Sequence, residues 1–337
     1  MRIRRHARTT AVLLAAVALA AAGCSSSGGK GSEDDGDGSA GGGKGVSTPR
    51  LKIAMVTHAG EGDSFWDIVR KGAQQAAGKD NVQFLYANDK EAKGQAQALQ
   101  SYVDKKVDGI IVTLAKPEAM KEPLANAKKA GIPVITINSG GEFSARNGAL
   151  SHIGQDESVA GEAVGRQLNE EKRKKAICVI HEQGNVSLEA RCAGVKKTFD
   201  GTIENLNVEG TNAPASQSSI SAKLQATKDI DAVVTLGAPI AEYALKAKQE
   251  TGSKAQLATF DLNREVLDNL KSKKFAFAVD QQPYLQGYEA VDLLWLYKWN
   301  SNVLGGGKQV FTGPEIISAD DTDRLQRLEK YTARGTR

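Results

Sequence analysis

A carboxylate, a serine and two aromatic rings stand together in the run Asp63-Ser64-Phe65-Trp66. The run follows an apolar segment, 51–57, that predicts a strand, and the apolar residues after it recur at helical spacing. In α/β proteins, ligands bind at the loops that connect the carboxyl ends of the strands to the following helices. Two chemistries fit these residue types. The serine could be a nucleophile, or the acid and the rings could bind a hydroxylated ring.

The nucleophile hypothesis lacks a partner. Gly62-Asp63-Ser64 resembles the opening block of GDS-type hydrolases, which need a histidine base, usually in a late Asp-x-x-His. The last histidine of the chain is His181, and no Gly-x-Ser-x-Gly elbow occurs. A GDS-type hydrolase is therefore a remote alternative, and we expect no catalytic residues and no enzyme.

Cofactor and metal sites are also not expected. The turn after the first predicted strand contains Gly60 and Gly62, as a dinucleotide fingerprint would, but the third glycine is missing and Phe65-Trp66 block close backbone approach. The four histidines are scattered, and no HxxxH or CxxC spacing appears. We therefore predict neither a cofactor nor a metal.

The amino-terminal region predicts export. Residues 1–23 combine four arginines, a short apolar run and the small residues Ala21-Ala22-Gly23 before Cys24, as in a lipoprotein signal peptide. We expect a lipid to be attached to Cys24. The protein could be exported by the general secretion pathway or by the twin-arginine pathway. Residues 24–49 are rich in Ser, Gly, Asp and Lys and predict a flexible tether. The protein should lie outside the cytoplasm in the cell envelope, anchored to the membrane by this lipid.

Charge excludes nucleic acid as an expected partner. Four of the 44 basic residues lie in the signal, which has no acidic residue, so the rest of the chain carries 40 basic and 40 acidic residues. No basic cluster interleaved with aromatic residues remains.

Of the other cysteines, Cys178 lies in a predicted strand and Cys192 in the next helix. Export permits a disulfide between them, and two separate buried thiols are the alternative.

Repeated strand–helix units fill the chain after Arg50. Continuous apolar runs predict strands that helices cover on both faces, and about 290 residues of this pattern predict two lobes with a seam near 153–156. The predicted strands are 51–57, 82–87, 109–114, 133–138, 176–181, 206–210, 232–236, 256–260 and 275–280. The fold class is therefore α/β, with two Rossmann-like lobes of parallel sheet.

Polar residues follow several of these strands. They are Asp63, Thr113, Asn138, Ser139, Gly237, Asp261 and Gln281. Each alone could be a helix cap or a turn residue. Together they predict that both lobes present amides and carboxylates at one edge, with aromatic rings beside them.

The chain resembles the periplasmic sugar-binding proteins of the ribose/galactose-binding cluster, the substrate-binding components of ABC importers. The resemblance covers about 51–317 and rests on Asp63-Ser-Phe-Trp66, Gly109-Ile-Ile-Val112, Ala130–Asn138, His152-Ile-Gly-Gln-Asp156 and Phe260-Asp261. It implies the type I periplasmic-binding fold, with three hinge strands near 154–156, 281–283 and 311–314. The implied parts are 50–154 plus 283–312 for the N-terminal lobe, 155–282 plus 313–325 for the C-terminal lobe, and a tail at 326–337.

The resemblance also assigns ligand contacts position by position. Asp63, Phe65 and Trp66 match the segment whose polar residue contacts hydroxyls and whose aromatic rings sandwich the sugar, while Asp261 and Gln281 match family contacts in the second lobe. Thr113, Asn138 and Ser139 stand where the family has Asn, Asp and Arg. Glu189 replaces an Arg of the ribose binders, with Arg191 nearby. Gly237, His58, Asn185 and Asn212 complete the expected ligand-binding set.

The resemblance implies capture of a monosaccharide or polyol between closing lobes and delivery to ABC permease subunits by a monomeric lipoprotein. The lost arginines indicate a ligand other than ribose, and a pentose, a hexose, a polyol or inositol would fit; Glu189 could select an amino sugar. A sensor lipoprotein that feeds a membrane receptor is the alternative. A sugar-responsive repressor core shares the fold but needs a helix-turn-helix where this chain has a signal and a tether.

Overall fold

The computed structural model describes residues 46–60 and 63–331, which belong to one compact unit spanning Lys44–Arg337. The predicted signal peptide, Cys24 and most of the predicted tether lie outside the described residues. The chain is already held at Thr48, whose carbonyl accepts a hydrogen bond from Asn81 and whose hydroxyl accepts one from Trp295. The fold therefore begins slightly before the predicted boundary at Arg50.

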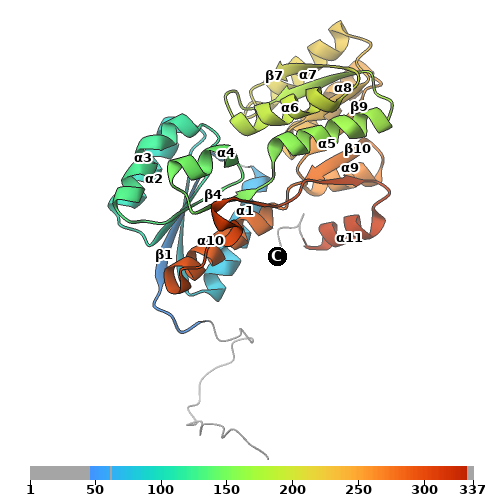
Figure 1. Ribbon diagram of the computed structural model, residues 1–337. Helices are drawn as coiled ribbons and strands as arrows, with labels where there is room; N and C mark the ends of the chain where they lie inside the picture. The colour runs from blue at the N-terminus through green and yellow to red at the C-terminus, as the bar shows by residue number, and fades with distance from the viewer. Residues whose placement is uncertain (1–45, 61–62, 332–337) are drawn as a thin grey trace, which may run out of the picture. The chain divides into compact units, whose positions relative to one another are not determined.

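The first lobe is built on a six-stranded sheet in the order β11-β5-β4-β3-β1-β2, with all neighbours parallel (Figure 1). Its strands are β1 (Leu51–Thr57), β2 (Val82–Asn88), β3 (Gly109–Val112), β4 (Val134–Ile137), β5 (Ser151–Gly154) and β11 (Gln309–Phe311). Its helices are α1 (Ser64–Lys79), α2 (Ala92–Asp104), α3 (Pro117–Lys129), α4 (Gly141–Ser144) and α10 (Pro283–Asn300), with short 3₁₀ turns at η1 (Ala145–Asn147) and η2 (Leu304–Gly307).

The second lobe repeats this topology, in the order β12-β10-β9-β8-β6-β7. Only the pairing of β10 with β12 is antiparallel. Its strands are β6 (Lys175–Ile180), β7 (Thr202–Asn207), β8 (Ala232–Thr235), β9 (Gln256–Phe260), β10 (Phe275–Asp280) and β12 (Glu315–Ser318). Its helices are α5 (Glu157–Glu170), α6 (Val186–Thr198), α7 (Ala213–Ala226), α8 (Ala238–Thr251), α9 (Arg264–Lys271) and α11 (Thr322–Tyr331). Thus β1 corresponds to β6, β4 to β9 and β5 to β10.

Apolar burial on both faces explains the parallel sheets. The inner strands β3, β4 and β8 are buried at every position, so each needs a helical layer on either side. Glycines let the covering helices approach closely. A Cβ on Gly72 of α1 would lie 2.0 Å from the Tyr284 carbonyl oxygen of α10, and one on Gly161 of α5 would lie 2.1 Å from the Arg191 carbonyl oxygen of α6. The helix pairs α1/α10 and α5/α6 therefore depend on these glycines.

The chain passes from one lobe to the other at three places. These are residues 155–156 between β5 and α5, 281–282 between β10 and α10, and 312–314 between β11 and β12. All three fall within the predicted hinge segments. The predicted two-lobed α/β fold with parallel sheets is thereby confirmed.

Two details of the predicted fold are wrong. The strand predicted at 206–210 is β7, which lies at 202–207, because it is a largely exposed edge strand and carries no continuous apolar run. The predicted tail at 326–337 begins inside α11, which continues to Tyr331 and packs its buried Leu325 into the second lobe's core.

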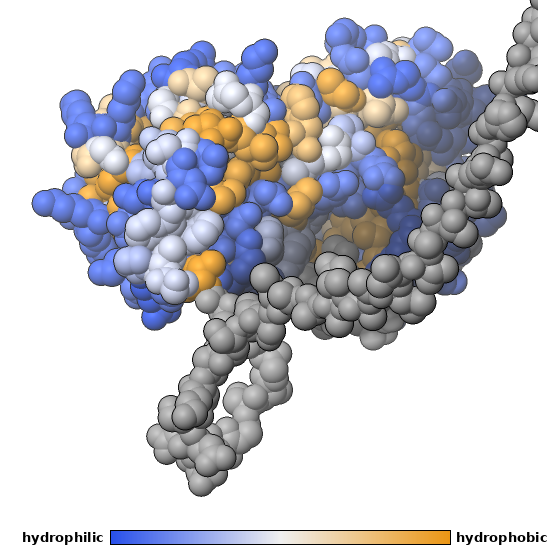
Figure 2. Space-filling view, turned by 60° about the horizontal axis from the view of Figure 1, so that its bottom comes forward, coloured by the Kyte–Doolittle hydropathy of each residue, from blue (hydrophilic) through white to orange (hydrophobic). Residues whose placement is uncertain are grey.

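Hydrophilic residues cover much of the face displayed in Figure 2, with apolar residues in smaller patches between them. Within 46–60 and 63–331, no helix has the length and apolar character needed to cross a membrane.

Candidate functional site: a polar cavity between the lobes

A cavity of about 410 Å³ lies between the two lobes, at the carboxyl ends of the parallel strands. This volume falls within the range of small-molecule sites, roughly 300–1,000 Å³. The position agrees with the rule that open α/β sheets bind ligands beyond the carboxyl ends of their strands.

Most residues predicted for the site line this cavity. They are His58, Asp63, Phe65, Trp66, Asn138, Ser139, Asn185, Arg191, Gly237, Asp261 and Gln281. The sequence reasoning missed further lining residues, among them Lys90, Glu91, Lys116, His181, Glu182, Ser187, Thr211 and Tyr243. His181 and Glu182 come directly after β6, which is the signal that could have found them.

Three predicted contacts lie outside the cavity, and we correct them. Glu189 is exposed on α6. Residues two positions apart on a helix point about 200° apart, so Glu189 faces away when Arg191 faces the cavity. Asn212 is exposed and uses its side-chain oxygen to cap α7. Thr113 is fully buried behind His58. Selection of an amino sugar by Glu189 therefore finds no support.

Aromatic rings form one wall of the cavity in the first lobe. Asp63 caps the amino terminus of α1 by accepting a hydrogen bond of 3.0 Å from the Phe65 amide, which places both aromatic residues in the first turn of the helix. The Trp66 ring meets the rings of His58 and Phe65 edge to face, with centroids 5.0 and 5.1 Å apart. These packed rings give a preformed apolar surface beside a carboxylate.

A chain of hydrogen bonds links the two lobes at the base of the cavity. Asn138 donates to the side-chain oxygen of Gln281 at 2.9 Å, and Gln281 donates to Asp261 at 2.5 Å. Asn138 and Asp261 hold equivalent places after β4 and β9, and both adopt left-handed backbone angles, with φ of 62° and 68°. Asn and Asp tolerate this conformation better than most residues. The hinge residue Gln281 thus joins one polar residue from each lobe.

Arg191 enters the cavity from α6 and is fixed by Glu157. Two guanidinium nitrogens donate to the Glu157 carboxylate at 2.5 and 3.0 Å, and a third donates to the Leu236 carbonyl at 3.1 Å. The Arg191 guanidinium also lies over the Phe260 ring, 4.5 Å from its centroid. Gln155 donates to the same carboxylate at 2.7 Å. The buried charge of Arg191 is therefore paired before any ligand binds.

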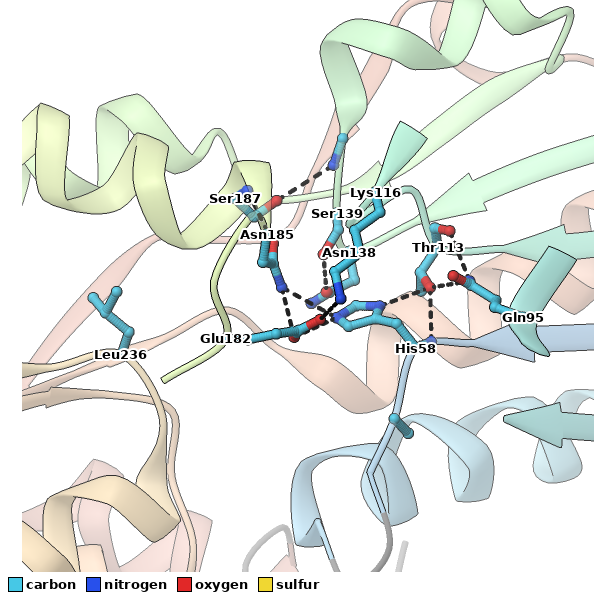
Figure 3. A network of polar contacts seen from close by, with 12 residues as sticks. His58, Gln95, Thr113, Lys116, Asn138, Ser139, Glu182, Asn185, Ser187 and Leu236 are labelled. Carbon is cyan, nitrogen blue, oxygen red and sulfur yellow. Dashed lines mark hydrogen bonds and ion pairs between the residues drawn. The ribbon is translucent and has the colours of Figure 1, made fainter. Parts of the chain in front are cut away.

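A second network fixes the imidazole of His58 (Figure 3). The Thr113 hydroxyl accepts hydrogen bonds from the His58 amide at 3.1 Å and from the Gln95 amide group at 2.9 Å. These bonds occupy both lone pairs of the hydroxyl, so its proton is donated to His58 Nδ1, 2.8 Å away. His58 then carries its own proton on Nε2, which lies 3.9 Å from the Glu182 carboxylate.

The amino-terminal segment of α6 contacts the first lobe directly. The Val186 amide donates to the Ala115 carbonyl at 3.1 Å, and the Gly140 amide donates to the Ser187 hydroxyl at 3.3 Å. An ion pair joins Lys116 of the first lobe to Glu182 of the second at 3.7 Å, as Figure 3 shows. The cavity is therefore closed on this side by contacts between the lobes.

Two carboxyl groups in the cavity are perturbed by burial. Desolvation raises the pKa of Asp261 to about 7, against the opposing effect of Arg191 and the hydrogen bond from Gln281. Desolvation likewise raises the pKa of Asp63 to about 6. Burial therefore favours the neutral form of both groups, whereas hydroxyl donors would favour the ionised form.

The second lobe contains the disulfide Cys178–Cys192, which joins β6 to α6. Its Cα atoms are 5.9 Å apart, and both cysteines are buried. The bond ties the middle of α6, one residue after Arg191, to the sheet. Among the described residues, no group of three or more His, Cys, Asp or Glu side chains could hold a metal ion.

Carboxylates, amides, imidazoles and a guanidinium beside packed aromatic rings are suited to recognising hydroxyl groups on a ring. A family model described as periplasmic binding protein domain matches residues 53–298. The solved structure of a carbohydrate transporter from Acidothermus cellulolyticus in complex with myo-inositol is 46% identical, with a TM-score of 0.83, covering 86% of this chain and all of that chain.

Curated relatives are more distant. The xylose/arabinose-binding protein of Sulfolobus acidocaldarius is 23% identical over 76% of this chain and 68% of its own length. The ribose import binding protein of Bacillus subtilis is 22% identical over 68% of this chain and 75% of its own length. These relatives are binding proteins, so the hydrolase hypothesis for Ser64 is wrong. The chain belongs to the periplasmic binding protein domain family and is a substrate-binding protein of the type I fold rather than an enzyme.

Proposed function

We propose that this protein is the extracytoplasmic substrate-binding component of a carbohydrate ABC importer and that it binds a neutral cyclitol or monosaccharide between its two lobes. Myo-inositol is the first candidate ligand. The observation that carries the proposal is the relative of 46% identity, which was crystallised with myo-inositol.

The content of the cavity supports a neutral, hydroxyl-rich ligand. Asp63 and Asp261 offer carboxylate acceptors from opposite lobes, and Trp66 offers an apolar face. Three basic side chains line the cavity. Arg191 and Lys116 already have carboxylate partners, namely Glu157 and Glu182, whereas the exposed Lys90 forms no ion pair with a described residue. An anionic ligand would therefore meet acidic groups without gaining a free cation from either pair.

The proposal includes a membrane anchor. Cys24 would carry the lipid, residues 24–49 would form the tether, and the closed protein would dock as a monomer on permease subunits. The support is the sequence pattern around Cys24, since this part of the chain lies outside the described residues. Replacing Cys24 by Ala should abolish incorporation of labelled palmitate in cells, whereas replacing Cys192 should not. Equal labelling of the Cys24 variant would refute the anchor.

A thermal-shift panel tests the ligand. At one hundred times its dissociation constant, a ligand stabilises the folded state by about 2.7 kcal/mol. For lobes of this size we expect Tm to rise by roughly 5–10 °C. The panel should contain myo-inositol, other cyclitols, hexoses, pentoses and sugar phosphates. A shift with sugar phosphates alone, or with no carbohydrate, would refute the proposal.

A further inference from the structure

Two histidines occupy equivalent places in the two lobes. His58 follows the last residue of β1, and His181 follows the last residue of β6, the strand that corresponds to β1 in the repeated topology. Both side chains line the cavity. His58 already belongs to the predicted site, whereas His181 has been assigned no part in it.

The second lobe makes room for the His181 ring with two glycines. A Cβ on Gly237 would lie 3.2 Å from His181 Cε1 and 3.9 Å from the Asp261 carboxylate, and a Cβ on Gly210 would lie 3.1 Å from His181 Cδ2. Any larger residue at either position would press on the imidazole. Gly237 has no side chain, and the His181 imidazole lies beside the space that a larger side chain at this position would fill.

The polar atoms of the His181 ring lack partners in the described protein. Nδ1 is buried and forms no hydrogen bond there. Burial also lowers the pKa of His181 to about 4, so the ring is neutral near pH 7 and carries one proton. A buried N–H without a partner is costlier than a bare lone pair, so the proton belongs on Nε2. His181 is then an N–H donor at the cavity wall, as His58 is in the first lobe.

We propose that His181 is a specificity-determining ligand contact, paired with His58, so that each lobe presents one imidazole N–H donor and one carboxylate acceptor to the ligand. The acceptors are Asp63 in the first lobe and Asp261 in the second. A hydroxyl can donate one hydrogen bond and accept two, so a single hydroxyl can bridge the donor and the acceptor of one lobe. A ring with hydroxyls on opposite sides engages both lobes. This inference rests on the proposed function.

Calorimetric titration of the purified protein with myo-inositol tests the pair. His181→Ala should weaken binding by about 10- to 100-fold, because a ligand hydroxyl is left without its donor. His181→Gln, whose amide can still donate, should recover part of the loss. The matched control is His152→Gln, since His152 is a buried histidine of the first lobe that does not line the cavity. Its affinity should stay within about twofold of the parent, or roughly 0.4 kcal/mol.

Monodeoxy-inositols locate the contact. In the parent protein, removing the inositol hydroxyl that contacts His181 should lower the affinity strongly. In His181→Ala, removing the same hydroxyl should lower the affinity less than ~3-fold, as in a double-mutant cycle. Parent-like binding by His181→Ala, or no coupled ring position, would overturn the inference while leaving the proposed function intact. Failure of the parent protein to bind any cyclitol or monosaccharide would overturn both.

A spectroscopic readout remains valid if the variants fold poorly. In long-range ¹H–¹⁵N spectra of the parent protein, myo-inositol should shift the ring nitrogen signals of His58 and His181 and leave those of His152 unchanged. A shift at His58 without one at His181 would contradict the assignment.

Discussion

Replacing Glu157 by Gln removes the charge that pairs with Arg191 inside the second lobe. The Arg191 side chain is about 4% exposed and that of Glu157 about 9%, so the guanidinium would be left buried with a neutral partner. Breaking a buried ion pair on one side costs about 3–5 kcal/mol. For a lobe of about 150 residues this corresponds to a fall in Tm of roughly 6–20 °C. Burial raises the pKa of Glu157, because it disfavours the charged form, and the Arg191 charge opposes this rise.

The matched control is Glu162→Gln. Glu162 lies on the same helix, α5, and also pairs with a cation of α6, Lys197 at 2.6 Å, but this pair is on the surface. Surface pairs contribute little, so Tm of this variant should stay close to that of the parent. Differential scanning calorimetry on both variants gives the comparison. A Glu157→Gln protein as stable as Glu162→Gln would refute the view that Arg191 is held by a buried, desolvated pair.

Three further outcomes follow from the site. Trp66→Ala should weaken ligand binding at least ~10-fold in calorimetry, because the ligand ring loses the apolar surface that it packs against. The control is Trp299→Ala, which should bind normally, since Trp299 is 39% exposed at the end of α10. Normal binding by both variants would remove Trp66 from the site. Ligand affinity should fall between pH 8 and pH 5.5, by up to about tenfold per pH unit, because protonation of Asp261, whose pKa is about 7, removes a hydrogen-bond acceptor. The Asp261→Asn variant should bind weakly and lose most of this pH dependence. A variant whose pH profile matches that of the parent would contradict the assignment. Replacing Cys178 and Cys192 by Ala should lower the free energy of unfolding by about 3 kcal/mol, as expected for a loop of this length; denaturation curves that coincide with those of the parent would exclude a stabilising disulfide.

Periodicity and apolar runs predict most of this fold because inner parallel strands are buried on both faces. The same reasoning fails at the edges. β7 is largely exposed and has only two apolar residues, Ile203 and Leu206, three positions apart, so its pairing with β6, not its composition, makes it a strand. The strands β5, β11 and β12 were not predicted, since Ser-His-Ile-Gly, Gln-Val-Phe and Glu-Ile-Ile-Ser contain no more than two apolar residues in a row.

The residues that line the cavity can be predicted from the sequence where a residue follows a strand, but not where helix phase or burial decides. Asp63, Asp261 and Gln281 follow from their place in the chain. Glu189 does not, because matching a family position ignores that Arg191, two residues later, already occupies the cavity face of α6. Thr113 contacts His58 and does not line the cavity, which only the three-dimensional structure reveals.

A crystal structure of the protein grown with myo-inositol tests the central claim most directly. The account predicts one ring in the cavity between the lobes, stacked against Trp66, with hydroxyls within hydrogen-bonding distance of Asp63 and Asp261. A ligand bound outside this cavity, or within it but touching only one lobe, would contradict the account.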